Sequence, residues 1–296
     1  MQEIKNRICW NKADKGTGEI FYLAMEYSGK DQDGNDTVSM KTLRKVFQLE
    51  TYMIKSKVSK EQIAELEKLH SVDPKAMLMS EMEEQDKREQ DKLIYKMIKY
   101  AGSVNEKIGW STIVFKANKW FGYEPKFRVK EDSDLFGKII SISNSIASKT
   151  RRSDADFIMV GPAMASRIMD LPQFVYNDPN QPDLDRSTGL IHKVGAFGNK
   201  FSVIINPMLH WNDESIVIGS NTSEGQEGIY QYEMEPEIIE TEEISPDNLM
   251  PYTVLNYKKR MALVATNNAH LKYYTLNTTI KRHNILTHLI NKIFKK

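Results

Sequence analysis

Six histidines and one cysteine are the side chains best suited to metal binding or acid–base chemistry, so their spacing is the first test of function. The histidines are His70, His192, His210, His270, His283 and His288. None forms a His-Glu-x-x-His pair or lies in a cysteine-bearing zinc pattern. His283 and His288 are five residues apart, so they would diverge on a helix. We therefore expect no metal and no cofactor.

Catalytic motifs are also missing from the sequence. It contains no Gly-x-Ser-x-Gly elbow, no Walker loop and no dinucleotide-binding fingerprint. Carboxylate pairs for acid–base catalysis are assembled in space, so a chain with 40 acidic residues cannot reveal them by spacing. The sequence favours a structural protein over an enzyme.

Composition excludes several classes of protein. The 296 residues include 41 basic and 40 acidic side chains, and the net charge of +1 gives no global attraction to nucleic acid or membrane. The only cysteine, Cys9, excludes an internal disulfide framework and agrees with folding in a reducing cytoplasm. No stretch approaches the ~20 apolar residues of a membrane span, and no secretory signal opens the chain. We expect a soluble, intracellular product.

Local charge is concentrated in a few segments. Residues 222–247 hold nine acids and no base, which indicates a solvated face, with a cation or partner site as the less favoured reading. Residues 278–296 carry five bases, no acid and apolar residues at helical spacing. Such a basic helix can bind a membrane surface, nucleic acid or a partner, and its plain alternative is packing against its own protein. The clusters Arg151-Arg152 and 258–260 could contact phosphate, but surface ion pairs explain them equally well.

The elements that would position these groups begin with a predicted β-hairpin. Residues 19–27 and 38–54 are rich in aromatic and β-forming side chains, and the polar segment between them offers Asp33-Gly34 as a turn. An ordinary edge hairpin is the plain alternative to one that projects from the protein.

Two helices follow the hairpin. Ser59 and Gln62 form a capping-box pattern ahead of a short helix that ends near His70. Asp73 is placed to cap a second helix, with Pro74 at its first position.

The second helix, 74–100, has an unusual middle. Residues 83–92 include eight charged side chains, which we expect to lie on a solvated or subunit-facing surface rather than in a core. A coiled-coil arm would need sustained apolar heptads, and these are absent.

Helices and strands then alternate. The patterns predict a helix, a buried strand and a short helix, then further strands, one of which is either a strand pair or a long bent strand. In order, these segments are 135–149, 156–160, 162–168, 201–205, 215–219, 252–265 and 271–277.

Four segments, in this order, resemble the major head protein family of T-even-type bacteriophages. In the first, His70, Asp73, Glu81 and Arg88 match the family in type and spacing. The second is the most specific, because it combines an arginine pair, a buried strand and a small-residue helix. Departures from the family pattern are Ser153 for glycine, Asn206 for aspartate and Met261 for tyrosine. The four segments are 62–89, 146–168, 198–207 and 250–265.

The resemblance implies an α+β protein with the Hong Kong 97-type capsid fold, built from an extended hairpin loop, a peripheral domain bearing a long spine helix, and an axial domain. The family usually carries a longer N-terminal region removed in maturation; either this chain is not processed in that way or the region is missing. The implied divisions are an N-terminal arm 1–18, hairpin loop 19–55, peripheral domain 56–155 with spine 74–100, axial domain 156–249, return to the peripheral domain 250–276, and basic tail helix 277–296.

The resemblance also implies a function: a major capsid protein that assembles into hexamers and pentamers of an icosahedral head in the host bacterial cytoplasm. Its partners would be other copies of itself, scaffold, portal and decoration proteins, and packaged DNA contacted without sequence specificity; no membrane is implied. The hairpin would lie on a neighbouring subunit. The expected interface residues are Phe21, Tyr22, Tyr27, Asp33, Gly34, Glu83, Glu84, Lys87, Arg88, Arg151 and Arg152.

Other functions remain open at this point. A vertex protein or an encapsulin-like cargo shell would share the fold. A DNA-binding structural protein would use the basic C-terminal helix and bind DNA in a salt-dependent way. A hydrolase using the acidic segment would need to retain a metal.

Overall fold

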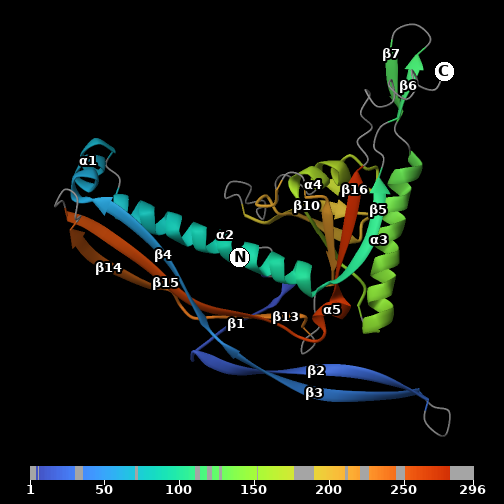
Figure 1. The fold of residues 1–296 in the computed structure, drawn as a ribbon, viewed down its shortest axis with the longest axis horizontal. Coiled ribbons are helices and arrows are strands. Elements are labelled where there is room, and N and C mark those ends of the chain that lie inside the picture. The colour runs from blue at the N-terminus through green and yellow to red at the C-terminus, as the bar shows by residue number, and fades with distance from the viewer. Residues whose placement is uncertain are drawn as a thin grey trace, which may run out of the picture. The chain divides into compact units, whose positions relative to one another are not determined.

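The computed structural model places the chain in two compact units (Figure 1). The first comprises Met1–Ile98, Arg186–Leu190 and Thr222–Ala269, and the second comprises Lys99–Asp185, Ile191–Asn221 and His270–Lys296. No helix in the described part of the chain is long and apolar enough to cross a membrane. The residues that the structure describes are 5, 7–30, 36–70, 73–110, 114–118, 122–126, 129–151, 153–176, 190–210, 213–220, 227–244 and 251–280.

A five-stranded sheet organises the first unit. Its central strand, β15 (Pro251–Ala265), is antiparallel to three others, and β1 is parallel to β13. The segment predicted as a strand pair or a bent strand is therefore one long strand. The other members are β1 (Cys9–Lys12), β13 (Ile229–Glu233), β14 (Glu237–Ile244) and β4 (Glu50–Ser59).

Both predicted helix starts are confirmed. Helix α1 (Lys60–His70) begins with a reciprocal capping box, in which Gln62 N donates to Ser59 Oγ at 3.1 Å and Ser59 N donates to Gln62 Oε1 at 3.2 Å. Helix α2 (Pro74–Ala101) begins after Asp73, whose Oδ1 accepts from the next turn's backbone N–H groups at 2.9 and 3.3 Å. Local capping chemistry thus determines where each helix begins.

Helix α2 packs along the sheet of its unit (Figure 1). Met82 of the helix contacts Leu255 and Tyr257 of β15, and all three side chains are buried. The apolar N-terminal half of the helix therefore has a defined partner surface.

The predicted hairpin is confirmed, with one correction. Strands β2 (Thr17–Lys30) and β3 (Asp36–Gln48) form a separate two-stranded sheet, but the second predicted run, 38–54, is divided between β3 and β4. The division falls at Leu49, which is buried and whose N–H donates to the Gly16 carbonyl at 2.8 Å. The chain therefore passes from the hairpin into the five-stranded sheet at a buried leucine. The predicted turn at Asp33-Gly34 lies outside the described residues.

A seven-stranded sheet organises the second unit, in the order β5-β16-β12-β8-β11-β10-β9. Strands β8 and β12 are buried at every position, which explains their continuous apolar sequence. The strands are β5 (Ser103–Trp110), β16 (Tyr273–Ile280), β12 (Ser215–Gly219), β8 (Phe157–Val160), β11 (Phe201–Ile205), β10 (His192–Phe197) and β9 (Phe174–Tyr176).

Helix α3 (Val129–Thr150) and α4 (Pro162–Met169) contribute to the core of this second unit. Ile139 and Ile146 of α3 are fully buried in the same cluster as Phe201 of β11. The remaining elements are α5 (Ala269–Lys272) and a second two-stranded sheet of β6 (Val114–Asn118) and β7 (Gly122–Lys126).

Two expected boundaries differ from the structure. Residues 99–155 belong with the second unit, because β5 pairs with β16 and α3 packs in the core of that unit. Residues 222–249 belong with the first unit, because β13 and β14 pair with β15. The predicted tail helix is wrong at its start, since 278–280 extends strand β16; residues 281–296 lie outside the described part.

Candidate assembly interface

The hairpin has one face committed to its own unit and one face exposed. Ile20, Tyr22 and Phe47 are buried against the sheet of the first unit, and Phe47 stacks on Tyr232 with ring centroids 4.2 Å apart. Phe21, next to Tyr22, points to the opposite face and is 62% exposed.

The exposed face of the hairpin, which we call the outer face, includes Glu19, Phe21, Met40, Thr42, Arg44 and Val46. Cross-strand register places Phe21 opposite Arg44 and Glu19 opposite Val46. Met40 and Val46 are 60% and 62% exposed. The outer face thus carries three exposed apolar side chains, and its two charged residues, Arg44 and Glu19, form an ion pair with each other.

The expected interface residues of the hairpin separate accordingly. Phe21 lies on the outer face, but Tyr22 is only 4% exposed and belongs to the core of its own unit. Its inclusion as an interface residue was wrong, because successive strand residues point to opposite faces. Tyr27 lies on β2, and Asp33 and Gly34 are outside the described residues.

The expected residues of α2 lie on its accessible side. Glu83 and Lys87 are exposed, and Glu84 and Arg88 are half-buried. Arg88 donates to Glu84 at 2.9 Å and to Glu81 at 3.0 Å. Because these side chains are partly or largely exposed, the two ion pairs contribute little to stability.

The charged middle of α2 is not wholly solvated, which corrects our prediction. Asp86, Gln90 and Asp91 are 3%, 1% and 0% exposed. Asp86 and Gln90 continue the four-residue spacing of the buried apolar residues Met82 and Ile94. The buried stripe of the helix therefore runs through its polar centre.

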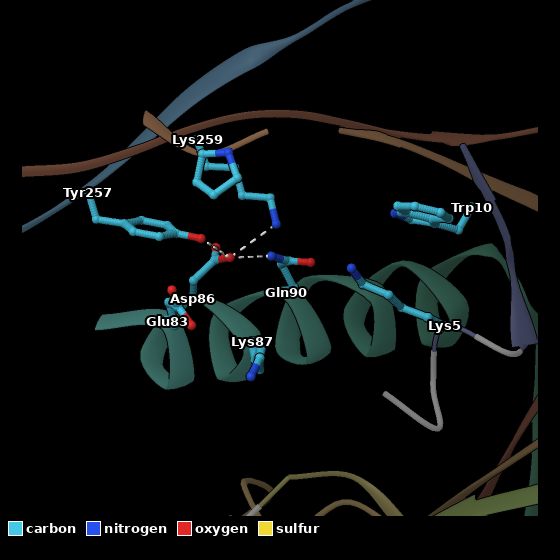
Figure 2. Close-up of a pocket in the computed structure, with 9 residues that line it drawn as sticks. Lys5, Trp10, Glu83, Asp86, Lys87, Gln90, Tyr257 and Lys259 are labelled. Carbon is cyan, nitrogen blue, oxygen red and sulfur yellow. Dashed lines mark hydrogen bonds and ion pairs between the residues drawn. The ribbon is translucent and has the colours of Figure 1, made fainter. Parts of the chain in front are cut away.

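Asp86 is held by three donors (Figure 2). Its Oδ2 accepts hydrogen bonds from Gln90 Nε2 at 2.6 Å, Tyr257 Oη at 3.0 Å and Lys259 Nζ at 3.1 Å. Lys259 also pairs with Glu233 at 2.9 Å. Helix α2 and strands β13 and β15 are thus joined by a buried charge cluster, composed of Asp86, Gln90, Glu233, Tyr257 and Lys259.

Glu233 is the second anion of the cluster. Besides Lys259, it accepts from Trp10 Nε1 at 2.6 Å, Lys5 Nζ at 3.0 Å and Gln231 Nε2 at 3.1 Å. Burial by itself would raise the pKa of Glu233, but the bonds from Lys259 and Lys5 outweigh it and hold that pKa below its ordinary value. Glu233 is therefore ionised at neutral pH.

The charge cluster borders a pocket of about 440 Å³ in the first unit (Figure 2). Burial, followed by the negative charge of Asp86, raises the pKa of Tyr257, so its hydroxyl stays protonated and donates. No group of three or more histidine, cysteine or acidic side chains in the described ranges could hold a metal ion. The pocket lining is Lys5, Trp10, Glu83, Asp86, Lys87, Gln90, Pro236, Tyr257 and Lys259.

Lys259 was not anticipated as a structural residue. Sequence inspection placed it in a basic cluster able to contact phosphate, but its side chain is 8% exposed and is bound by two carboxylates. The four-residue spacing of Met82, Asp86, Gln90 and Ile94 was the available signal, because it predicts that Asp86 is buried and needs a cation.

The arginine pair belongs to the second unit. Arg151 follows α3 with φ of 51°, a left-handed conformation that is uncommon outside glycine, and its N–H donates to the Ala147 carbonyl at 2.7 Å. Arg151 is exposed at the end of the helix. Arg152 lies outside the described residues.

Comparison with known proteins agrees with this architecture. A family model described as major capsid protein Gp23 matches residues 10–287. No curated protein matches the chain.

Solved structures with a similar fold come from several bacteriophages. A structure from Microbacterium phage Oxtober96 is 12% identical, with a TM-score of 0.52 over 94% of this chain and 91% of that chain. The capsid of Cyanophage P-SCSP1u is 10% identical, with a TM-score of 0.54 over 95% and 89%. The mature capsid of bacteriophage PhiM1 is 11% identical, with a TM-score of 0.51 over 94% and 87%. At these identities the likeness shows the fold alone, and this confirms the predicted Hong Kong 97-type capsid fold.

Because the family model spans most of its length, the chain belongs to the Gp23 family of major capsid proteins, and it is a major capsid protein of a tailed bacteriophage.

Proposed function

We propose that copies of this chain assemble into hexamers and pentamers that tile a closed icosahedral head and retain packaged DNA. The observation that carries the proposal is the outer face of the hairpin. Its apolar residues Phe21, Met40 and Val46 are exposed, although the opposite face is packed in the core of the same unit. Exposed apolar side chains on an element whose opposite face is packed in a core are typical of a protein interface.

The two units would serve different positions in the capsomer. The first unit, with α2 as its spine, is the peripheral domain, and the second is the axial domain near the capsomer centre. The division follows the sheets, because each unit has its own sheet and its own core. The hairpin would lie on a neighbouring subunit, and Glu83, Glu84, Lys87 and Arg88 would face one.

The function needs no chemical turnover. Its stability would come from many partly polar subunit contacts rather than from one binding pocket. Assembly would take place in the host bacterial cytoplasm, with scaffold, portal and decoration proteins as further partners, and DNA would be contacted without sequence specificity.

The test is negative-stain electron microscopy of the purified protein, with light scattering on the same sample after size exclusion. Shells, tubes or rings of five or six subunits support the proposal. A persistent monomer or dimer, even with native partners supplied, overturns it. Shells that contain protein cargo and no DNA when isolated from infected cells would instead support a cargo compartment.

A matched pair of variants tests whether the outer face of the hairpin is needed for assembly. Phe21→Ser should reduce the fraction of assembled protein at least tenfold, because it removes an exposed aromatic anchor. Lys15→Ser changes an exposed residue in the turn before β2 and should leave that fraction unchanged. Equal assembly of the two variants would exclude the outer face from the interface.

A further inference from the structure

Strand β14 (Glu237–Ile244) is an edge of the five-stranded sheet. It pairs with β15 on one side, and no described strand pairs with its other side. All eight of its residues are exposed, including Ile238 at 43%, Ile239 at 44% and Ile244 at 68%. A long edge strand with exposed apolar residues is a template for pairing with another chain.

The charges that normally protect such an edge are neutralised within the same unit. Each of the four glutamates of β14 pairs with a lysine from a neighbouring element: Glu237 with Lys258 at 3.6 Å, Glu240 with Lys75 at 2.5 Å, Glu242 with Lys60 at 2.9 Å and Glu243 with Lys57 at 2.8 Å. An approaching strand therefore meets balanced ion pairs and isoleucines rather than a row of free carboxylates.

The hairpin, for its part, has only two strands and would be stabilised by pairing with a third. In the half of the hairpin nearer its base, Asn268 Nδ2 donates to the Leu23 carbonyl at 3.0 Å and Lys45 Nζ donates to the Ala265 carbonyl at 2.7 Å. Beyond these, β2 and β3 pair with each other as far as Lys30 and Asp36, and no other described strand joins them. An isolated two-stranded ribbon is only marginally stable in water, so a third strand would stabilise it.

Strand β14 and the hairpin of the same copy cannot pair with each other. In the first unit, β14 lies at the end of the sheet near α1, and the hairpin extends away from it (Figure 1). Pairing between copies would join two different surfaces, a head-to-tail contact of the kind that closes into rings.

We infer that strand β3 of one copy pairs with the free edge of β14 in a neighbouring copy and extends the five-stranded sheet by β-augmentation. This inference rests on the proposed function. Strand β3 is chosen over β2 by formal charge. Strand β3 carries Lys41, Arg44 and Lys45 against Asp36, whereas β2 carries Glu19 and Glu26 against Lys30, and the positive strand is the better match for a strand with four glutamates.

The test is photo-crosslinking in assembled particles. A benzophenone amino acid replaces Thr241, near the middle of β14, and shells are formed from this variant mixed with nitrogen-15-labelled wild type. Mass spectrometry should find crosslinks from Thr241 to labelled peptides within 36–48. As a control, the same amino acid at Thr51, an exposed position of β4, should give at least tenfold fewer such crosslinks.

Electron microscopy of the same sample distinguishes a failure of the strand pairing from a failure of the proposed assembly. Intact shells in which the crosslinks map outside 36–48, or join only residues of one copy, overturn the strand pairing and leave the proposed function standing. Failure of the unmodified wild type to form shells or rings counts against both.

Discussion

Lys259 of β15 and Asp86 of α2 form an ion pair at 3.1 Å with side chains that are only 8% and 4% exposed. Their partners Glu233, Tyr257 and Gln90 complete the cluster. A charge in such a position costs several kcal/mol to bury, so each member depends on the others.

Removal of the cation should destabilise the first unit strongly. Lys259→Met leaves Asp86 and Glu233 buried without their shared partner, and we expect a loss of about 3–5 kcal/mol in the free energy of unfolding. Urea unfolding of the unassembled chain measures this loss. Lys87→Met, at an exposed position of α2, is the control and should change stability by less than about 0.5 kcal/mol. A similar small effect at Lys259 would contradict the role of the cluster.

Protonation of Glu233 should contribute to the decrease in the free energy of unfolding at acid pH. Its pKa in the folded protein is held below the ordinary value of 4.5, so the unfolded chain binds more protons as the pH decreases. The stabilisation is complete above pH 4.5 and is lost as the pH falls through the folded-state pKa. The wild type should therefore lose more stability than Glu233→Gln over that range. Parallel pH profiles of the two proteins would argue against this assignment.

The two neighbouring aromatic residues of the hairpin should behave in opposite ways. Tyr22→Ala removes a buried ring and should cost about 3 kcal/mol of stability in the unassembled chain. Phe21→Ala removes an exposed ring and should change stability by less than about 0.5 kcal/mol, but should reduce assembly. Thermal unfolding and particle yield, measured on both variants, distinguish the two roles; reversed results would place the core on the other face.

The start of α2 should depend on the side-chain oxygen of Asp73. Asp73→Ala removes the acceptor of two backbone N–H groups and should cost about 1 kcal/mol. Asp73→Asn retains an oxygen in the same place and should restore most of that loss. Urea unfolding of both variants provides the measurement, and equal stability of alanine and asparagine would show that the cap contributes nothing.

Two glycines of the second unit provide a packing test. A Cβ at Gly219 would overlap Cζ of the buried Phe157, so Gly219→Ala should cost about 1–3 kcal/mol. Gly137 lies in α3, and no described atom comes within 4 Å of where its Cβ would stand, so Gly137→Ala should stabilise the helix by up to about 1 kcal/mol. Thermal unfolding should show shifts of opposite sign, and a tolerated alanine at Gly219 would contradict the packing around β12.

Features that depend on near neighbours in the chain were predictable from the sequence. The capping box at Ser59 and Gln62, the start of α2 at Pro74 and the buried strand β8 all follow from side chains within a few positions of one another. The resemblance to the capsid family likewise rested on motifs in a fixed order.

Only the tertiary structure decided which face of a strand or helix is buried. Alternation along β2 predicts that Phe21 and Tyr22 point to opposite faces, but the core against which Tyr22 packs comes from β13 and β15, more than 200 residues away. Lys259 illustrates the same limit, because the carboxylate that it neutralises, Asp86, lies 173 positions earlier. Local sequence determines periodicity and helix starts, whereas burial and charge compensation depend on contacts between distant segments, and these exist only once the chain has folded.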